Sequence, residues 1–219
     1  MVTCCKLFAS RVTSLPMTAP SRPYHHGNLR ESLLQAAEKA LESGGIQGLT
    51  LRQLSRELGV SHTSPLRHFS NKQALLDGLA IRGFERLGET LSRAVKHRGQ
   101  EFSARLTRLA RAYVGFQAKH AALCGLMFEA KHRPEAPREL LEAGERAFSH
   151  GPAIFAEGQA NGEVAAGDPA RLSLVVFAAL QGLIAISTNG KFKGVSLDIL
   201  VPEIVARIIV GMRPSSDKS

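Results

Sequence analysis

The chain has 219 residues, enough for one large domain or two small ones, since domains commonly hold ~100–200 residues. Hydrophobic residues make up 44% and charged residues 21%, a globular composition that excludes wholesale disorder. Aromatic residues reach only 5% and Trp is absent, whereas Ala and Leu are abundant. Strand-rich folds depend on β-branched and aromatic residues, so this composition favours helices.

The net charge is +9, which favours an anionic partner or surface. This charge is unevenly distributed. Residues 20–100 carry 12 Lys or Arg against 7 Asp or Glu, whereas residues 101–219 carry 14 against 12. Five of the eight His also fall within 20–100. We therefore expect the anionic partner to meet the N-terminal half.

Cysteine usage and hydropathy bear on the compartment. Cys4 and Cys5 are adjacent and Cys124 stands alone, so no disulfide scaffold is expected and a reducing compartment is favoured. The longest apolar run, residues 174–186, has 13 residues, fewer than the ~20 of a membrane span. These features predict a soluble, cytoplasmic protein with no membrane span and with Cys124 as a small core residue.

The first 22 residues differ from the rest because they contain no Asp or Glu and no helical period. An organellar transit peptide is one interpretation. A disordered tail over 1–22 is the simpler one, with Met17 instead of Met1 as an alternative start. We therefore expect that deletion of residues 1–16 leaves the melting temperature unchanged.

Residues 29–99 show apolar residues at the spacing of amphipathic helices. The first helix is expected to end at Gly44-Gly45, and the second begins at Thr50, whose spacing to Gln53 fits a capping box. Gly59 ends that second helix. The predicted helices of this half span residues 29–44, 50–59, 61–69 and 71–99.

The second half is also helical, with no repeat and no convincing strand. Asp168-Pro169 places an acidic N-cap before a Pro at the first helical position, which predicts a helix from 169 to 188. That helix is apolar nearly all round, so other helices or a second subunit must cover it. Ser196 caps a last helix, which Pro202 is expected to bend. Further stripes predict helices around 106–116, 123–127 and 140–155, the last with a kink at Gly151-Pro152.

Residues 50–69 match the helix-turn-helix pattern, in which two short helices meet across Gly59. In such a unit the second helix enters the major groove of DNA while the first lies across the backbone. Leu54 and Val60 are expected to fix the angle between the helices. Spacing alone is weak evidence, because the corner of a helical bundle has the same pattern.

Four segments of this region together resemble the DNA-binding domain of the tetracycline-repressor (TetR) family. With the preceding helix, the similarity covers residues 27–87, and its order and spacing are specific. It implies an all-helical, homodimeric, ligand-responsive transcription regulator, with a repressor as the expected case. The four segments are residues 50–55 (TLRQLS), 58–61 (LGVS), 67–69 (RHF) and 72–76 (KQALL).

A second, less specific similarity points to one branch of the family, whose C-terminal domain is named for a Trp-His-Gly motif. Phe177 and Gln181 stand where Trp and His are expected, so only Gly182 matches that motif. The resemblance implies a three-helix DNA-binding domain over 23–87 and a helical effector-binding and dimerisation domain over 88–213. The segments that carry this similarity are residues 24–27 (YHHG), 112–116 (AYVGF) and 126–128 (LMF).

Nine residues are expected to contact double-stranded DNA. Thr50 offers a hydroxyl and free N–H groups to a phosphate, and Arg52 can bind guanine O6 and N7 or hold a phosphate. Without the motif, Arg52 is simply a solvated surface residue, and residues 61–64 are simply caps. Lys72 starts a helix, where its charge opposes the macrodipole unless a phosphate is near. The set is Thr50, Arg52, Ser61, His62, Thr63, Ser64, Arg67, His68 and Lys72.

Two residues depart from the family pattern. Pro65 fits the first turn of a helix capped by Ser61, or the first position of one capped by Ser64, and these alternatives turn different side chains into the groove. Leu66 stands where the family usually carries a Tyr whose hydroxyl holds a phosphate. Neighbouring basic residues must then supply more of the backbone contact, with Lys72 among them.

The C-terminal half contains the candidate effector pocket. Its aromatic residues come from helices that should converge, and pockets in helical bundles are mainly apolar with few polar groups. Gln181 lies one turn from Phe177, and its buried amide needs a ligand, a backbone group or a subunit-interface Gln as partner. The absence of charges predicts an apolar, weakly polar effector. The candidate set is Tyr113, Phe116, Phe128, Phe148, Phe155, Phe177 and Gln181.

The chain is expected to dimerise through the helices over 169–188 and 196–211, with Val176 as a candidate interface residue. Two such subunits would read a pseudo-palindromic operator. An alternative is a helical small-molecule carrier without specific operator binding, which the altered Leu66 supports.

No catalytic residue, cofactor or metal site is predicted. Glu129 and His132 form a Glu-x-x-His pair, but no second copy exists, and His25-His26 has no ligand cluster at a recognised spacing. Phosphate loops and nucleophile elbows are also lacking from the sequence.

Overall fold

The structure is a computed structural model that describes residues 29–96, 101–188 and 196–214. Within these residues all regular secondary structure is helical, which confirms the expected all-α fold. The predicted tail over 1–22, with its alternative start at Met17, lies outside the described residues. The elements are α1 (Leu29–Gly44), α2 (Leu51–Glu57), the 3₁₀ helix η2 (Pro65–Arg67), α3 (Lys72–Val95), α4 (Phe102–Lys119), α5 (Ala121–His132), α6 (Arg138–Phe148), α7 (His150–Ala160), α8 (Pro169–Thr188) and α9 (Leu197–Gly211).

The first two helices end at the residues that the sequence indicates. Thr50 caps α2, and its Oγ1 accepts a hydrogen bond from Gln53 N at 3.1 Å. Gly45 and Gly59 adopt φ angles of +65° and +66°, a left-handed conformation that Gly adopts without steric cost. Both glycines let the chain turn sharply after a helix.

The segment after Gly59 is not the regular helix predicted over 61–69. Its backbone hydrogen bonds mostly join residues three apart, as from Arg67 N to Ser64 O at 3.3 Å, and only Pro65–Arg67 form a 3₁₀ turn. Pro65 explains the difference. A helix that began at Ser61 would need an N–H at residue 65 to bond the Ser61 carbonyl, and proline has none.

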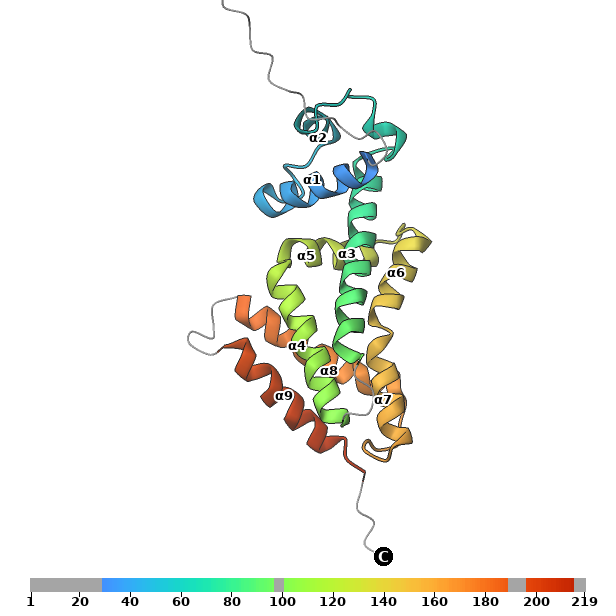
Figure 1. Cartoon of the computed structure of the whole chain (residues 1–219), viewed down its shortest axis with the longest axis vertical. Coiled ribbons are helices and arrows are strands. Elements are labelled where there is room, and N and C mark those ends of the chain that lie inside the picture. The colour runs from blue at the N-terminus through green and yellow to red at the C-terminus, as the bar shows by residue number, and fades with distance from the viewer. Residues whose placement is uncertain (1–28, 97–100, 189–195, 215–219) are drawn as a thin grey trace, which may run out of the picture.

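The 24 residues of α3 connect the N-terminal module to the C-terminal bundle, along which α3 runs lengthwise (Figure 1). Asn71 caps this helix, because its Oδ1 accepts a hydrogen bond from Ala74 N at 2.9 Å. The helix ends at Val95, and the predicted end near Gly99 lies outside the described residues. The expected domain boundary at residues 87–88 therefore falls inside a continuous helix.

The bundle is built from α4 to α9, together with α3. Asp168 begins α8 as predicted, since its Oδ1 accepts from Ala170 N at 2.9 Å, and Ser196 caps α9 by accepting from Asp198 N at 3.2 Å. The kink expected at Gly151-Pro152 is instead a break between α6 and α7. Pro152 then lies in the first turn of α7, where a missing N–H has little cost.

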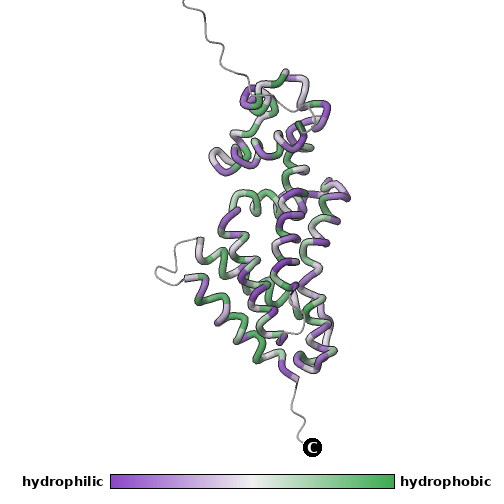
Figure 2. Tube along the Cα trace, viewed as in Figure 1, coloured by the Kyte–Doolittle hydropathy of each residue, from purple (hydrophilic) through white to green (hydrophobic). Residues whose placement is uncertain are grey.

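Helices α8 and α9 carry an apolar face that the chain itself leaves uncovered, and both are predominantly hydrophobic in Figure 2. Leu174 is 61% exposed and Val175 51%, whereas Val176, the expected interface residue, is only 5% exposed and packs inward. By length and composition alone, Pro169–Ser187 could cross a membrane. One such helix is weak evidence for a membrane span, because the core helix of a soluble protein passes the same test.

Candidate nucleic-acid interface and effector pocket

The predicted DNA-contacting residues form a polar surface at the end of the molecule opposite the bundle. Among them only Ser64 and Lys72 are partly buried. The residues that are exposed are Thr50, Arg52, Ser61, His62, Thr63, Arg67 and His68. The structure thus brings together on one short module the side chains that the sequence singled out.

Hydroxyl groups at the start of the reading segment, residues 61–68, bond one another. Ser61 Oγ lies 3.1 Å from Thr63 Oγ1 and 2.7 Å from Ser64 Oγ. Ser64 is the N-cap of the 3₁₀ turn and Pro65 its first residue, but the Ser64 side chain makes no capping hydrogen bond. Of the two placements expected for Pro65, the one after Ser64 is therefore correct.

Two buried residues hold the reading segment in place. Pro65 and Phe69 are buried, and the guanidinium of Arg30 stacks on the Phe69 ring, 5.4 Å from its centroid. Leu66 between them is 51% exposed. Leu66 is thus an exposed apolar side chain on an otherwise polar surface.

Lys72 has a partner that the sequence did not reveal. Its Nζ donates a hydrogen bond to the Ile46 carbonyl at 2.6 Å, which ties the start of α3 to the turn before α2. This carbonyl explains a cation at a helix N-terminus without a phosphate. A phosphate contact by Lys72 stays a prediction.

The aromatic residues of the C-terminal half surround a pocket of ≈340 Å³, at the lower end of the ~300–1,000 Å³ typical of ligand sites. Five of the seven predicted residues line it. Phe148 is central, because its ring centroid lies 5.3 Å from that of Phe177 and 6.1 Å from that of Tyr113. The five are Tyr113, Phe128, Phe148, Phe155 and Phe177.

Gln181 has a hydrogen-bond partner within the chain. The Tyr113 hydroxyl donates to Gln181 Oε1 at 2.9 Å and accepts from Gln117 Nε2 at 2.8 Å. Burial raises the pKa of Tyr113 well above its ordinary value, so this hydroxyl stays neutral and keeps its proton as a donor. The network holds α4 against α8.

Phe116 was wrongly assigned to the pocket. It packs against His120, with ring centroids 4.9 Å apart, on a different side of α4. Phe116 lies one turn from Tyr113 on α4, but it lines a separate surface together with Arg86 and His120. The sequence also missed the basic pair Lys131 and His132, which line the pocket from the end of α5.

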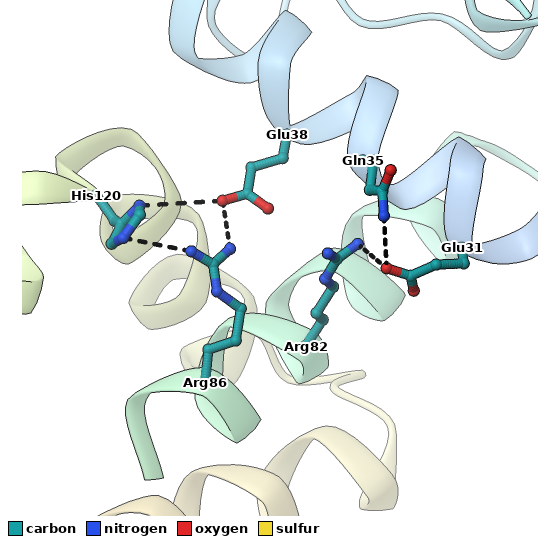
Figure 3. Close-up of polar contacts among 6 residues, drawn as sticks. All are labelled: Glu31, Gln35, Glu38, Arg82, Arg86 and His120. Atoms are coloured by element: carbon teal, nitrogen blue, oxygen red, sulfur yellow. Dashed lines mark hydrogen bonds and ion pairs between the residues drawn. The ribbon is translucent and has the colours of Figure 1, made fainter. Parts of the chain in front are cut away.

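A cluster of charged residues joins α1 to the bundle (Figure 3), and no motif predicted it. Arg86 of α3 donates to Glu38 of α1, and its other terminal nitrogen lies 3.3 Å from His120 Nε2. One turn away, Arg82 pairs with Glu31 at 2.9 Å. The one available signal was charge complementarity, acids on α1 against Arg on α3.

Glu129 is exposed, and His132 Nδ1 lies 2.7 Å from the Phe128 carbonyl oxygen. His120 lies with Glu38 and Glu42, the possible ligand atoms falling within 4.8 Å of one another. Arg86 already neutralises Glu38. Cys124 is a buried core residue as predicted, and burial raises the pKa of its thiol to about 12.

Two family models match the chain. "Bacterial regulatory proteins, tetR family" matches residues 33–79, and "Tetracyclin repressor-like, C-terminal domain" matches residues 106–210. The chain belongs to the TetR family. TetR-family regulators are DNA-binding proteins and not enzymes, which agrees with the module and the pocket described above.

Curated TetR relatives match part of the chain. Tetracycline repressor protein class D of Escherichia coli is 46% identical over 52 residues, which are 24% of this chain and 24% of the relative. The class A repressor from transposon 1721 of Escherichia coli is 35% identical over 134 residues, 57% of this chain and 58% of the relative. The chain thus spans less than two thirds of these relatives.

Solved structures cover more of the chain. A protein with unknown function from Rhodococcus sp. RHA1 is 42% identical with a TM-score of 0.82, over 88% of this chain and 99% of that one. The TetR family transcriptional regulator PfmR from Thermus thermophilus is 18% identical with a TM-score of 0.63, over 81% and 97%. The latter likeness concerns the fold alone.

Proposed function

We propose that this TetR-family regulator binds a pseudo-palindromic operator as a homodimer in the cytoplasm and acts as a repressor that a small effector releases. The observation that carries the proposal is the exposed polar reading segment, anchored by Pro65 and Phe69 at the start of α3. Arg52 and Thr50 flank it from α2. Together they supply the base-reading and phosphate-binding groups that a helix-turn-helix unit needs.

The uncovered face of α8 and α9 supports the dimer. Five large hydrophobic side chains of these two helices are 39–63% exposed, and helices this apolar are usually covered by other helices or by a second subunit. Paired across a two-fold axis, the two helices of each subunit would cover one another. The reading segments would then lie ~34–36 Å apart, the spacing of successive major grooves. The exposed residues of this face are Leu174, Val175, Ile186, Ile199 and Val210.

A chain of polar contacts supports coupling between the effector pocket and the DNA-binding module. Arg133, directly after the pocket residues at the end of α5, bonds both oxygens of Asp77 on α3, at 3.0 and 3.1 Å. Asp77 also accepts from Gln73, in the first turn of α3. An effector that shifts the end of α5 changes this contact, and it changes operator affinity by its differential affinity for the two arrangements.

The test is a gel-shift titration with the DNA upstream of the protein's own gene against excess unrelated DNA. We expect a sequence-specific complex whose affinity falls with salt, because phosphate contacts release counterions. Binding without sequence preference would overturn the operator proposal. Retained ligand binding together with loss of any DNA complex would instead favour the carrier, for which the exposed Leu66 is the supporting observation.

A further inference from the structure

The effector pocket contains a cation but no acid. Lys131 lines it from the last turn of α5, and no Asp or Glu is among the lining residues. The Lys131 ammonium lies 5.8 Å from the centroid of the Phe148 ring. In the part of the chain that the structure describes, no hydrogen bond or ion pair joins Lys131 to a carboxylate.

The position of Lys131 depends on a glycine in the facing helix. Gly144 of α6 is buried, and a Cβ placed there would lie 3.1–3.2 Å from the Cδ, Cε and Nζ of Lys131. The lysine stem therefore crosses α6 at the one residue type that leaves room for it. Packing of the stem over Gly144 holds the ammonium beside Phe148 and keeps it from extending freely into solvent.

The remaining lining is suited to an apolar body. The rings of Phe128, Phe148 and Phe177 lie with centroids 5.3–6.4 Å apart, and Tyr113 completes the group. The Tyr113 hydroxyl is already occupied by Gln181 and Gln117. Ser173 and His132 also line the pocket, and Lys131 is its lysine cation without a carboxylate partner in the described residues.

We propose that the effector is an apolar carboxylate, whose acid group pairs with Lys131 while its aliphatic or aromatic body lies against Phe128, Phe148 and Phe177. The proposal rests on the effector role given to this pocket above. A carboxylate is a stronger partner for an ammonium than an aromatic face is, because the hydrogen bond is charge-assisted on both sides. An organic ammonium is disfavoured because Lys131 repels it. The weakly polar effector expected from the sequence is thereby replaced by an anionic one.

Calorimetry with matched probes tests the class of ligand. Decanoate is compared with decan-1-ol and decyltrimethylammonium, below their micelle-forming concentrations, and biphenyl-4-carboxylate with biphenyl-4-methanol. In the wild-type protein we expect each carboxylate to bind about tenfold more tightly than its alcohol, the factor that one charge-assisted hydrogen bond supplies. The ammonium probe should bind most weakly.

Variants assign this preference to Lys131. Lys131→Met keeps the apolar stem over Gly144 and should remove the preference for carboxylate, with alcohol affinity unchanged within about twofold. Lys131→Arg should retain it. Lys39→Met, which removes an exposed lysine of α1, is the matched control and should bind as the wild type does.

The outcomes separate this proposal from the effector role of the pocket. Equal affinity for acids and alcohols, tightest binding of the ammonium, or an acid preference that survives in Lys131→Met overturns the anionic ligand and leaves the pocket standing. No binding by any probe to a wild-type protein that still forms its operator complex overturns the pocket itself, and the anionic ligand with it.

Discussion

The two ends of this molecule hold their functional residues in opposite ways. The reading segment is short, polar and exposed, and it is fixed by two buried residues, Pro65 and Phe69. The pocket is mainly apolar, and its lining comes from helices α3 to α8. One site is thus set by a local turn of the chain and the other by how six helices pack.

Mutations in the reading segment and mutations in the pocket should therefore have different effects. Exposed side chains of the reading segment can be changed with little effect on folding, so their loss should appear in DNA affinity alone. Pocket residues belong to the core, so their loss affects stability as well. Along α3, which joins the two ends, a single change should alter both.

The largest effect is expected at the α8–α9 face. Val175→Asp places a charge on a residue that is 51% exposed in the single chain, and it should yield monomers. Each monomer binds one half-site, so operator affinity should fall by ~10²–10⁴-fold, the usual contribution of linking two binding modules. Analytical ultracentrifugation and gel shift measure the two effects.

The control for this experiment is Leu141→Asp, which makes the same kind of change at a residue of α6 that is 36% exposed. It should remain a dimer with normal operator affinity. A Val175→Asp protein that stays dimeric would show that the interface lies elsewhere. Val176→Asp does not serve, because its buried charge should unfold the bundle.

The next largest effect concerns DNA affinity without a change in fold. If Arg52 reads a base, Arg52→Ala should cost ~1–3 kcal/mol of binding and relax sequence preference at one operator position. Its melting temperature should match the wild type, since the side chain is exposed. Arg138→Ala, which removes a 92% exposed arginine of α6, controls for net charge. A uniform loss across all DNA sequences would assign Arg52 to a phosphate instead.

The sequence predicted the locally determined reading segment better than the pocket, which depends on how distant helices pack. The caps at Thr50 and Asp168 and the glycine stop at Gly59 depend on neighbouring residues, and the structure bears out their effects. The predicted helix over 61–69 was wrong, because Pro65 lacks the N–H that would have made the first hydrogen bond of that helix.

Non-local features were harder to predict. The aromatic residues of the C-terminal half do converge, but a helix presents each side chain in one direction, and this direction placed Phe116 against His120 and Val176 inside. Partners from distant segments, such as Ile46 for Lys72 and Tyr113 for Gln181, have no sequence signature. The ion pair between Arg86 and Glu38 is also non-local, and charge complementarity between α1 and α3 was its one signal.

A smaller effect is expected where α3 supports the reading segment. A Cβ at Gly78 would lie 2.9 Å from Cε1 of the buried Phe69 ring, so Gly78→Ala must displace the residue that anchors this segment. Overpacking costs ~1–3 kcal/mol, and the higher helix propensity of Ala offsets ~1 kcal/mol of this cost. The free energy of unfolding should therefore decrease by about 1 kcal/mol. Operator affinity should fall as well. Gly115→Ala is the control, because an added Cβ there meets nothing within 4 Å, and it should stabilise the protein.

The smallest effect is a pH dependence at the contact between α1 and the bundle. Burial lowers the pKa of His120, and the neighbouring Arg86 cation lowers it further, against the opposing effect of Glu38. The unfolded chain, with a His pKa of ~6.5, then binds more protons than the folded one below that pH. Stability is therefore unaffected by this group above pH ~6.5 and decreases as the pH falls below it.

The variant His120→Gln removes this titration, and its amide can still accept from Arg86. Between pH 7.5 and pH 5.5 its melting temperature should fall less than that of the wild type. His62→Gln changes an exposed residue of the reading segment. Its melting temperature should fall over this pH range by as much as that of the wild type. Equal slopes for His120→Gln and the wild type would mean that the imidazole accepts its proton in the folded state as readily as in the unfolded chain. The Glu38 carboxylate would then offset the effects of burial and of the Arg86 cation at this contact.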